Sequence, residues 1–190
     1  MSDSSRLLDH RIGGVFVSHP KSGLEDREAH IISQFAQFGI PFEFVGAYLK
    51  EEITPEVRKR FNIGPDLRAG NASNAINHMI AYRKIVEDQL RCGLIFEDDV
   101  VLAKRFHSVL AGALDELENA DGPFVVYLAN SMNRYVDRKE RRKGQHLYRT
   151  NISKCPDAYL ISWEAARLRL EYVAKTASTR RMDIDMHSPM

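Results

Sequence analysis

The sequence predicts an α/β fold in which a mostly parallel sheet is flanked by helices. Short apolar runs of strand length alternate with longer segments of helical periodicity, and no internal repeat or low-complexity tract interrupts them. A chain of 190 residues with 44% hydrophobic content can bury roughly 70% of its unfolded surface, enough for one core. We therefore expect a single domain over residues 1–190, with its core at about 14–185 and a flexible segment at 1–10.

The predicted elements follow one another in βαβ order. Apolar runs predict strands at residues 14–17, 42–45, 93–96, 124–128 and 158–162. Helical patterns predict helices between them, at residues 24–38, 72–89, 104–119 and 163–176. Residues 51–67 contain two prolines and many charges, which favours a partly helical surface excursion. Residues 133–149 are strongly basic and have little apolar patterning, which favours a loop or hairpin.

The helix before the third strand has the clearest start signals. Gly70 interrupts the preceding pattern, and Asn71 and Ser73 are residues that commonly cap a helix. Apolar residues then recur at helical spacing: Ile76, Met79, Ile80 and Val86.

Three consecutive acids, Glu97, Asp98 and Asp99, directly follow the apolar run of the third strand. Burying one unpaired carboxylate costs roughly several kcal/mol, so three such groups beside a buried strand indicate a cation or phosphate partner. The carboxyl ends of strands are where open α/β sheets bind ligands. Hard carboxylate oxygens there suit Mg²⁺ or Mn²⁺ carrying a substrate phosphate. The alternative is that Asp98 or Asp99 simply caps the next helix.

Residues 70–102 resemble glycosyltransferase family 25, the lipooligosaccharide-type glycosyltransferases. Members of that family carry a Gly-Glu-x-Gly-Cys-x-x-Ser-His stretch, a helix reading Trp-Arg-Lys-Ile-Val and a strand ending in Glu-Asp-Asp. His78, residues 83–86 and residues 97–99 stand at the matching positions. The resemblance continues upstream at residues 15–18, at the pair Asp26-Arg27 and at 39–44, and downstream at 125–128 and 158–162, so that it spans roughly residues 15–185.

The resemblance implies a GT-A-like, Rossmann-related fold and a hexosyltransferase. Such an enzyme moves a hexose from a nucleotide sugar, such as a UDP-hexose, to a saccharide acceptor such as lipooligosaccharide. The expected cofactor is Mn²⁺ or Mg²⁺ on the donor diphosphate, held by Asp99 and Glu97. The expected donor-binding residues are Glu97, Asp98, His78 and Arg27. If the reaction inverts the anomeric carbon, Asp183 or Asp185 is the expected catalytic base, and a polar tail is the alternative role for both.

Two of the donor-site assignments also have alternatives. His78 could ligate a metal, contact the nucleotide or serve as a hydrogen-bonded helix residue facing the sheet. Arg27 matches phosphate oxygens in a bidentate manner, but it could equally be a surface base near a helix start.

The chain departs from the family pattern in two respects. Asn71, Ser73, Asn74 and Asn77 replace the usual Glu, Gly, Cys and Ser, and the chain ends earlier than family members usually do. These departures keep open a catalytically inactive, family-derived binding protein. A Mg²⁺-dependent phosphohydrolase is the other alternative, but it needs a nucleophilic Asp and a Lys at separate strand ends, and only Lys154 lies close before a later strand.

Composition limits the partners and the location. Lys and Arg total 27 against 26 Asp and Glu, so the net charge of +1 gives no general field for nucleic acid. Cys92 and Cys155 are too few for a disulfide framework or a zinc cluster, which favours reduced thiols. The start lacks an apolar signal region, and no apolar run approaches the ~18 residues of a membrane span. We expect a cytoplasmic protein, with peripheral contact at the inner face of the membrane as an open alternative.

Overall fold

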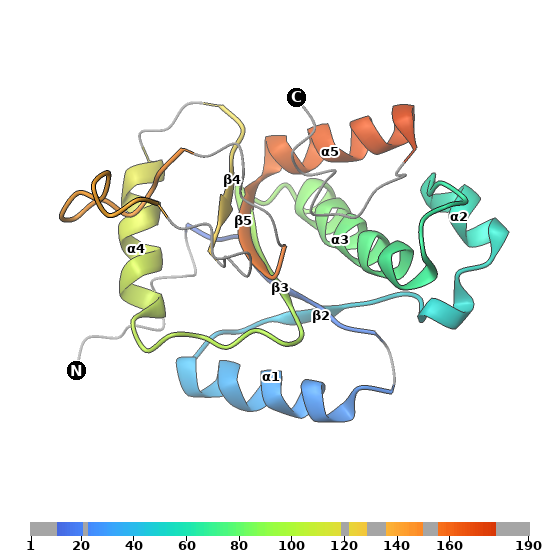
Figure 1. Cartoon of the computed structure of the whole chain (residues 1–190), viewed down its shortest axis with the longest axis horizontal. Coiled ribbons are helices and arrows are strands. Elements are labelled where there is room, and N and C mark those ends of the chain that lie inside the picture. The colour runs from blue at the N-terminus through green and yellow to red at the C-terminus, as the bar shows by residue number, and fades with distance from the viewer. Residues whose placement is uncertain (1–10, 21–22, 119–121, 129–135, 150–155, 178–190) are drawn as a thin grey trace.

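The computed structural model describes residues 11–20, 23–118, 122–128, 136–149 and 156–177. Within these residues five strands form one sheet in the order β2-β1-β3-β5-β4 (Figure 1). The strands are β1 (Gly14–Ser18), β2 (Glu43–Val45), β3 (Cys92–Glu97), β4 (Val125–Tyr127) and β5 (Ala158–Ser162).

Most of the strands share one direction. β1 pairs in parallel with β2 and with β3, whereas β5 pairs antiparallel with both β3 and β4. Only β5 therefore runs opposite to the other strands of this sheet. The predicted mostly parallel α/β fold is confirmed.

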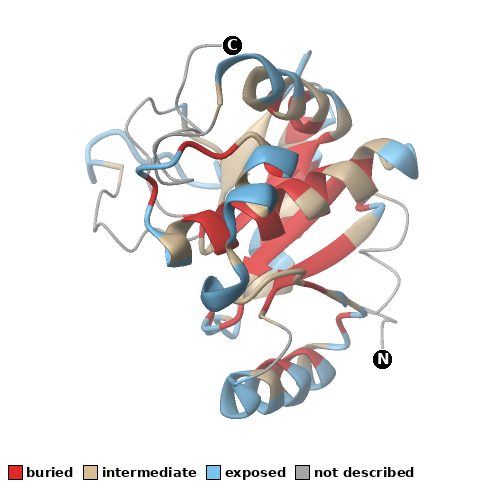
Figure 2. Ribbon diagram, turned by 90° about the vertical axis from the view of Figure 1, so that its right-hand side faces the viewer, coloured by how far each residue is buried: buried red, intermediate tan, exposed pale blue. Residues whose placement is uncertain are grey.

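Helices cover both faces of the sheet (Figure 1). α1 (Glu25–Phe38) and α4 (Phe106–Leu117) bury apolar residues against one face, together with Val17, Leu94 and Phe96. α2 (Pro55–Phe61), α3 (Ala69–Glu87) and α5 (Trp163–Thr176) pack on the other face, against Phe16, Ile95 and Tyr159. Figure 2 shows the central strands of the sheet and the inner side of α3 as the buried interior, and β1, β3 and β5 are these buried strands.

The predicted elements are present with small differences at their ends. β5 and α5 have the predicted bounds, and β3 extends by one residue at each end to include Glu97. A short 3₁₀ helix, η2 (Lys50–Glu52), and α2 confirm that residues 51–67 are partly helical. The described residues 136–149 form turns and irregular backbone, as the basic loop prediction requires.

The predicted start of α3 is wrong. The helix begins at Ala69, so Gly70 lies inside its first turn and neither Asn71 nor Ser73 is its cap. The Ser73 hydroxyl instead donates to the backbone oxygen of Tyr48 at 2.6 Å. The Ser73 side chain therefore holds the segment after β2. The local sequence pattern does not reveal this contact.

A glycine sets how closely α3 approaches β3. A Cβ atom added at Gly93 would lie 2.4 Å from Cδ1 of Ile85 on α3. Because Ile85 is fully buried, any larger residue at position 93 would displace its side chain from a packed position. Because α3 returns along the sheet before β3 begins, its first half lies beside the end of β3, where Asn74 contacts Glu97.

Two smaller expectations concern cysteine and the membrane. Cys92 is buried and unpaired, and burial raises the pKa of its thiol to about 11. Cys155 lies outside the described residues. In the part of the chain that the structure describes, no helix combines the length and apolar character that crossing a bilayer requires.

Candidate functional site at the ends of β1 and β3

Polar side chains gather where β1 and β3 end. Ser18 is the register partner of Glu97, so His19 and Asp98 follow side by side at the same edge of the sheet. The chain passes from β1 to β2 on one side and later to β3 on the other, so the strand order reverses here. In open α/β sheets ligands bind at such a reversal, and we refer to this edge of the sheet, between the ends of β1 and β3, as the crevice.

The alternation of side chains along β3 separates the first two acids. Ile95 packs with α3 and Phe96 packs with α1. Because successive side chains of a strand point to opposite faces, Glu97 lies on the α3 face and Asp98 on the α1 face. Their contacts agree, because Glu97 bonds to Asn74 of α3 and Asp98 bonds to Arg27 of α1.

Asp98 is buried and has a partner for each carboxylate oxygen. His19 Nδ1 lies 2.9 Å from Oδ2, and Arg27 Nη1 donates to Oδ1 at 2.7 Å. The alternative that Asp98 or Asp99 caps the next helix is wrong, because α4 begins at Phe106 with Arg105 before it. Asp98 instead joins the end of β1 to α1.

Glu97 is held from the other side by α3. Asn74 Nδ2 donates to Oε1 at 2.9 Å, and His78 Nε2 lies 3.7 Å from the same oxygen. Burial is the largest single influence and raises the pKa of Glu97, but His78, Asn74 and Arg27 together outweigh it. The net result is a pKa below the ordinary value, so Glu97 is an anion at neutral pH.

This lowered pKa predicts an acid-sensitive contribution to stability. A carboxylate with a depressed folded-state pKa stabilises the protein fully above its unfolded-state pKa, and the stabilisation is lost as the pH falls through the lower folded-state value. The free energy of unfolding should therefore differ between wild type and Glu97→Gln near neutral pH, and the difference should shrink in acid. Urea denaturation of both proteins over a range of pH, with chelator present, measures this difference in the free energy of unfolding. A difference that is constant with pH would contradict it.

Asp99 faces solvent at the mouth of the crevice. Its side chain is 53% exposed, and Arg27 Nη1 lies 3.3 Å from Oδ2, so Arg27 bridges Asp98 and Asp99. Beside Asp99 lies a cavity of about 360 Å³ with a largely apolar lining that includes Val101, Phe106 and Leu128. Of the three acids, Asp99 lines this cavity.

One face of α1 anchors the segment that carries the acids. His30 Nε2 and Gln34 Nε2 both donate to the backbone oxygen of Val100, at 3.0 and 2.9 Å. Gln34 Oε1 accepts from the amide of Leu102 at 2.7 Å. Together with the Arg27 contact to Asp98, these bonds fix the backbone around Asp99.

The structure brings together five of the predicted site residues: Arg27, His78, Glu97, Asp98 and Asp99. Asp183 and Asp185 lie outside the described residues. Sequence reasoning missed His19 as a site residue, although its position directly after β1 was a usable signal. It also treated Asn74 only as a departure from the family, although Asn74 precedes His78 by one helical turn.

In the described ranges, no group of three or more His, Cys, Asp or Glu side chains is placed to hold a metal ion. The split of Glu97 and Asp98 to opposite faces accounts for this. A cation here would therefore need oxygen ligands from a substrate as well as from the protein.

Comparison with known families gives a match over most of the chain. Residues 23–187 match the model described as glycosyltransferase family 25 (LPS biosynthesis protein). The chain belongs to glycosyltransferase family 25. The match contains every residue of the acid cluster and its partners on α1 and α3, with His19 just before it.

Similar family 25 proteins come from two bacterial genera. The lacto-N-neotetraose biosynthesis glycosyltransferase LgtE of Neisseria gonorrhoeae is 26% identical over 85% of this chain and 61% of its own length. The lipooligosaccharide biosynthesis protein lic2B of Haemophilus influenzae is 27% identical over 84% of this chain and 64% of its own length. A putative glycosyltransferase of Haemophilus influenzae is 28% identical over 78% of this chain and 54% of its own length. The chain thus spans less than two thirds of each.

Three of the four residues that depart from the usual family 25 pattern have definite side-chain contacts in this structure: Ser73, Asn74 and Asn77. Asn74 bonds to Glu97, and Asn77 Oδ1 accepts from the amide of Ala47 at 3.3 Å. Ser73 bonds to Tyr48. These side chains therefore connect α3 to the acid cluster and to the segment after β2.

Proposed function

We propose that this family 25 chain transfers a hexose from a nucleotide sugar, such as a UDP-hexose, to a saccharide acceptor such as lipooligosaccharide. The observation that carries the proposal is the acid cluster at the ends of β1 and β3 in a chain of this family: Arg27 bridges Asp98 and Asp99 there, and Glu97 lies beside them on the α3 face. The names of the relatives support the kind of acceptor.

A divalent cation, Mn²⁺ or Mg²⁺, fits the donor set if the diphosphate supplies the remaining ligands. Mg²⁺ is commonly bound by one or two carboxylates together with substrate phosphates. Of the two predicted ligands, Asp99 is the one exposed in the crevice, whereas Glu97 faces α3. We therefore assign the ion to Asp99 and Glu97 to hydroxyl groups of the donor. When bound, the dication neutralises the charge that builds on the departing diphosphate.

The protein side chains bind and orient the donor. Asp98 holds the guanidinium of Arg27 at the crevice, where its other N–H groups can donate to phosphate oxygens. The ionised Glu97 accepts hydrogen bonds from donor hydroxyl groups. The apolar cavity beside Asp99 gives the acceptor a place next to the reacting end of the donor. Asp183 or Asp185 remains our assignment for the base that deprotonates the acceptor hydroxyl.

Donor hydrolysis tests this function. The protein is incubated with UDP-glucose or UDP-galactose and Mn²⁺, and released UDP is measured with and without a saccharide acceptor. We expect Mn²⁺-dependent UDP release that increases with acceptor and stops with chelator. Phosphate release from phosphomonoesters would instead indicate a phosphohydrolase. No turnover and no binding of any nucleotide sugar would contradict the proposal, whereas binding without turnover would indicate a binding protein.

A further inference from the structure

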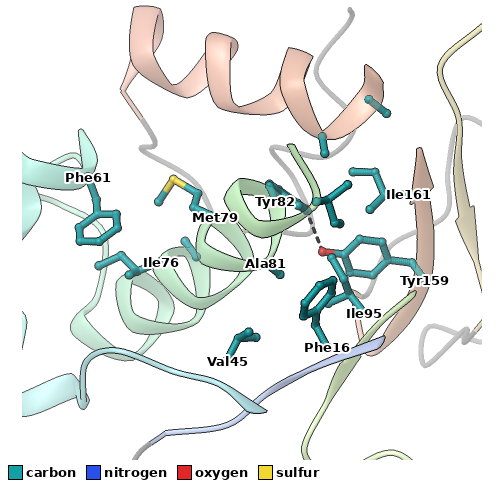
Figure 3. Close-up of a cluster of buried hydrophobic side chains, with 14 of the residues drawn as sticks. Phe16, Val45, Phe61, Ile76, Met79, Ala81, Tyr82, Ile95, Tyr159 and Ile161 are labelled. Atoms are coloured by element: carbon teal, nitrogen blue, oxygen red, sulfur yellow. Dashed lines mark hydrogen bonds between the residues drawn. The ribbon is translucent and has the colours of Figure 1, made fainter. Parts of the chain in front are cut away.

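A buried row of polar groups leads from the interior to Glu97. The hydroxyls of Tyr82 on α3 and Tyr159 on β5 lie 2.9 Å apart, and Figure 3 shows them meeting inside the core. The Tyr159 hydroxyl also lies 2.7 Å from His78 Nδ1. All three side chains are inaccessible to solvent or nearly so. His78 therefore does not reach a ligand directly, and its other ring nitrogen faces Glu97.

The row ends at His78 Nε2, close to Glu97 but beyond hydrogen-bond distance. His78 Nε2 is buried and has no hydrogen-bond partner within the described residues, and Glu97 Oε1 is 3.7 Å away. Asn74 donates to the same Oε1 at 2.9 Å. The contacts that Asn74 and His78 of α3 make with Glu97 are therefore both to Oε1. Among the described residues of α3, none makes such a contact with Oε2.

The positions of the protons follow from the neighbouring groups. Burial raises the pKa of both Tyr82 and Tyr159, so both hydroxyls keep their protons at neutral pH. A bare lone pair on His78 Nε2 would face the ionised carboxylate of Glu97 and be repelled, so this nitrogen carries a proton. In the neutral ring, Nδ1 then accepts from Tyr159, and Tyr159 accepts from Tyr82.

We propose that His78 and Tyr159 are positioning residues that direct the second carboxylate oxygen of Glu97, Oε2, toward a hydroxyl group of the bound nucleotide sugar. This inference rests on the proposed function. Tyr159 fixes the ring and the tautomer of His78, and the Nε2–H of His78 holds Oε1. Hydrogen bonds at such sites are often long without ligand and shorten when it binds, so the 3.7 Å separation closes in the complex.

Tyr159→Phe tests the role of the row because it removes one oxygen and keeps the buried ring. Calorimetry with UDP-glucose or UDP-galactose and Mn²⁺ should show donor affinity reduced by about fivefold. Tyr82→Phe is the matched control: it removes a hydroxyl from the same cluster but leaves the Tyr159 bond to His78. We expect it to change donor affinity by less than about twofold.

A double-mutant cycle separates positioning from packing. If Tyr159 acts through Glu97, Tyr159→Phe should change donor affinity by less than about twofold in a Glu97→Gln background. An equal loss in both backgrounds would show that Tyr159 acts through packing and would overturn the proposal.

A measurement without ligand distinguishes failure of this inference from failure of the proposed function. The ¹⁵N spectrum of the free protein near neutral pH should show the proton of the His78 ring on Nε2, and Tyr159→Phe should populate the other tautomer. If the His78 ring of wild type carried its proton only on Nδ1, the proposed contact from Nε2–H to Glu97 would be contradicted, even if nucleotide sugars bind. The expected tautomer in a protein that binds no nucleotide sugar would instead contradict the proposed function and the donor contact.

Discussion

Asp99→Asn should remove the Mn²⁺ dependence of UDP binding and reduce sugar transfer by about 10²–10³-fold. The reason is electrostatic: Asp99 is the exposed carboxylate of the crevice, and the proposed ion must neutralise a leaving diphosphate there. The fold should remain intact, because the side chain is 53% exposed and the change removes a charge next to two other acids. Calorimetry with UDP, in Mn²⁺ and in chelator, measures the effect on binding.

Asp66→Asn is a suitable control for this change. It removes the same charge from an exposed aspartate in the segment before α3. UDP affinity in that variant should rise with Mn²⁺ as in wild type. If Asp99→Asn also kept the full metal-dependent gain in affinity, Asp99 would not be a ligand of the ion.

Gly46→Ala should destabilise the protein by about 3 kcal/mol. A Cβ atom at Gly46 would lie 1.8 Å from the backbone oxygen of His19 and 3.0 Å from its carbonyl carbon. Both are main-chain atoms, so rotation of a side chain cannot relieve the overlap. The segment after β1 or the segment after β2 must therefore shift, and this disturbs the position of His19 beside Asp98. Urea denaturation measures the loss of stability, and nucleotide binding should weaken in parallel.

Gly70→Ala provides the matched comparison. A Cβ atom added there meets nothing within 4 Å, and the residue lies in the first turn of α3. Alanine is favoured over glycine in helices by roughly 1 kcal/mol, so this variant should be as stable as wild type or more stable. If Gly46→Ala unfolded at the same urea concentration as Gly70→Ala, the close approach to His19 would not be a constraint.

The sequence was sufficient for the fold class and for most elements because the relevant signals are local. Within the residues that the structure describes, apolar runs and helical spacing located the five strands and the four long helices, with differences of a few residues at their ends. The direction of β5 was not predictable in this way, since the same apolar run, Ala158–Ser162, is compatible with either direction. Tertiary contacts, not the local sequence, determine its antiparallel pairing with β3 and β4.

The candidate site was predictable in part for the same reason. Three adjacent acids at a strand end, with a histidine and an arginine of the family pattern, predicted a site at this edge of the sheet, and the structure brings these residues together there. The alternation of side chains could also have assigned Glu97 and Asp98 to opposite faces. The contact between His78 and Tyr159 joins residues 81 positions apart, and no local pattern indicates it.

The anchoring of the acid-bearing segment by α1 has a consequence for how this protein can vary. Arg27, His30 and Gln34 follow a spacing of three and four residues, so a single face of the helix makes all their contacts with residues 98–102. Deleting one residue between them would rotate the later positions by about 100° around the axis and carry Gln34 away from Val100. Length changes should therefore accumulate in the loops outside α1, while the interval from Arg27 to Gln34 keeps its number of residues even where the surrounding sequence drifts.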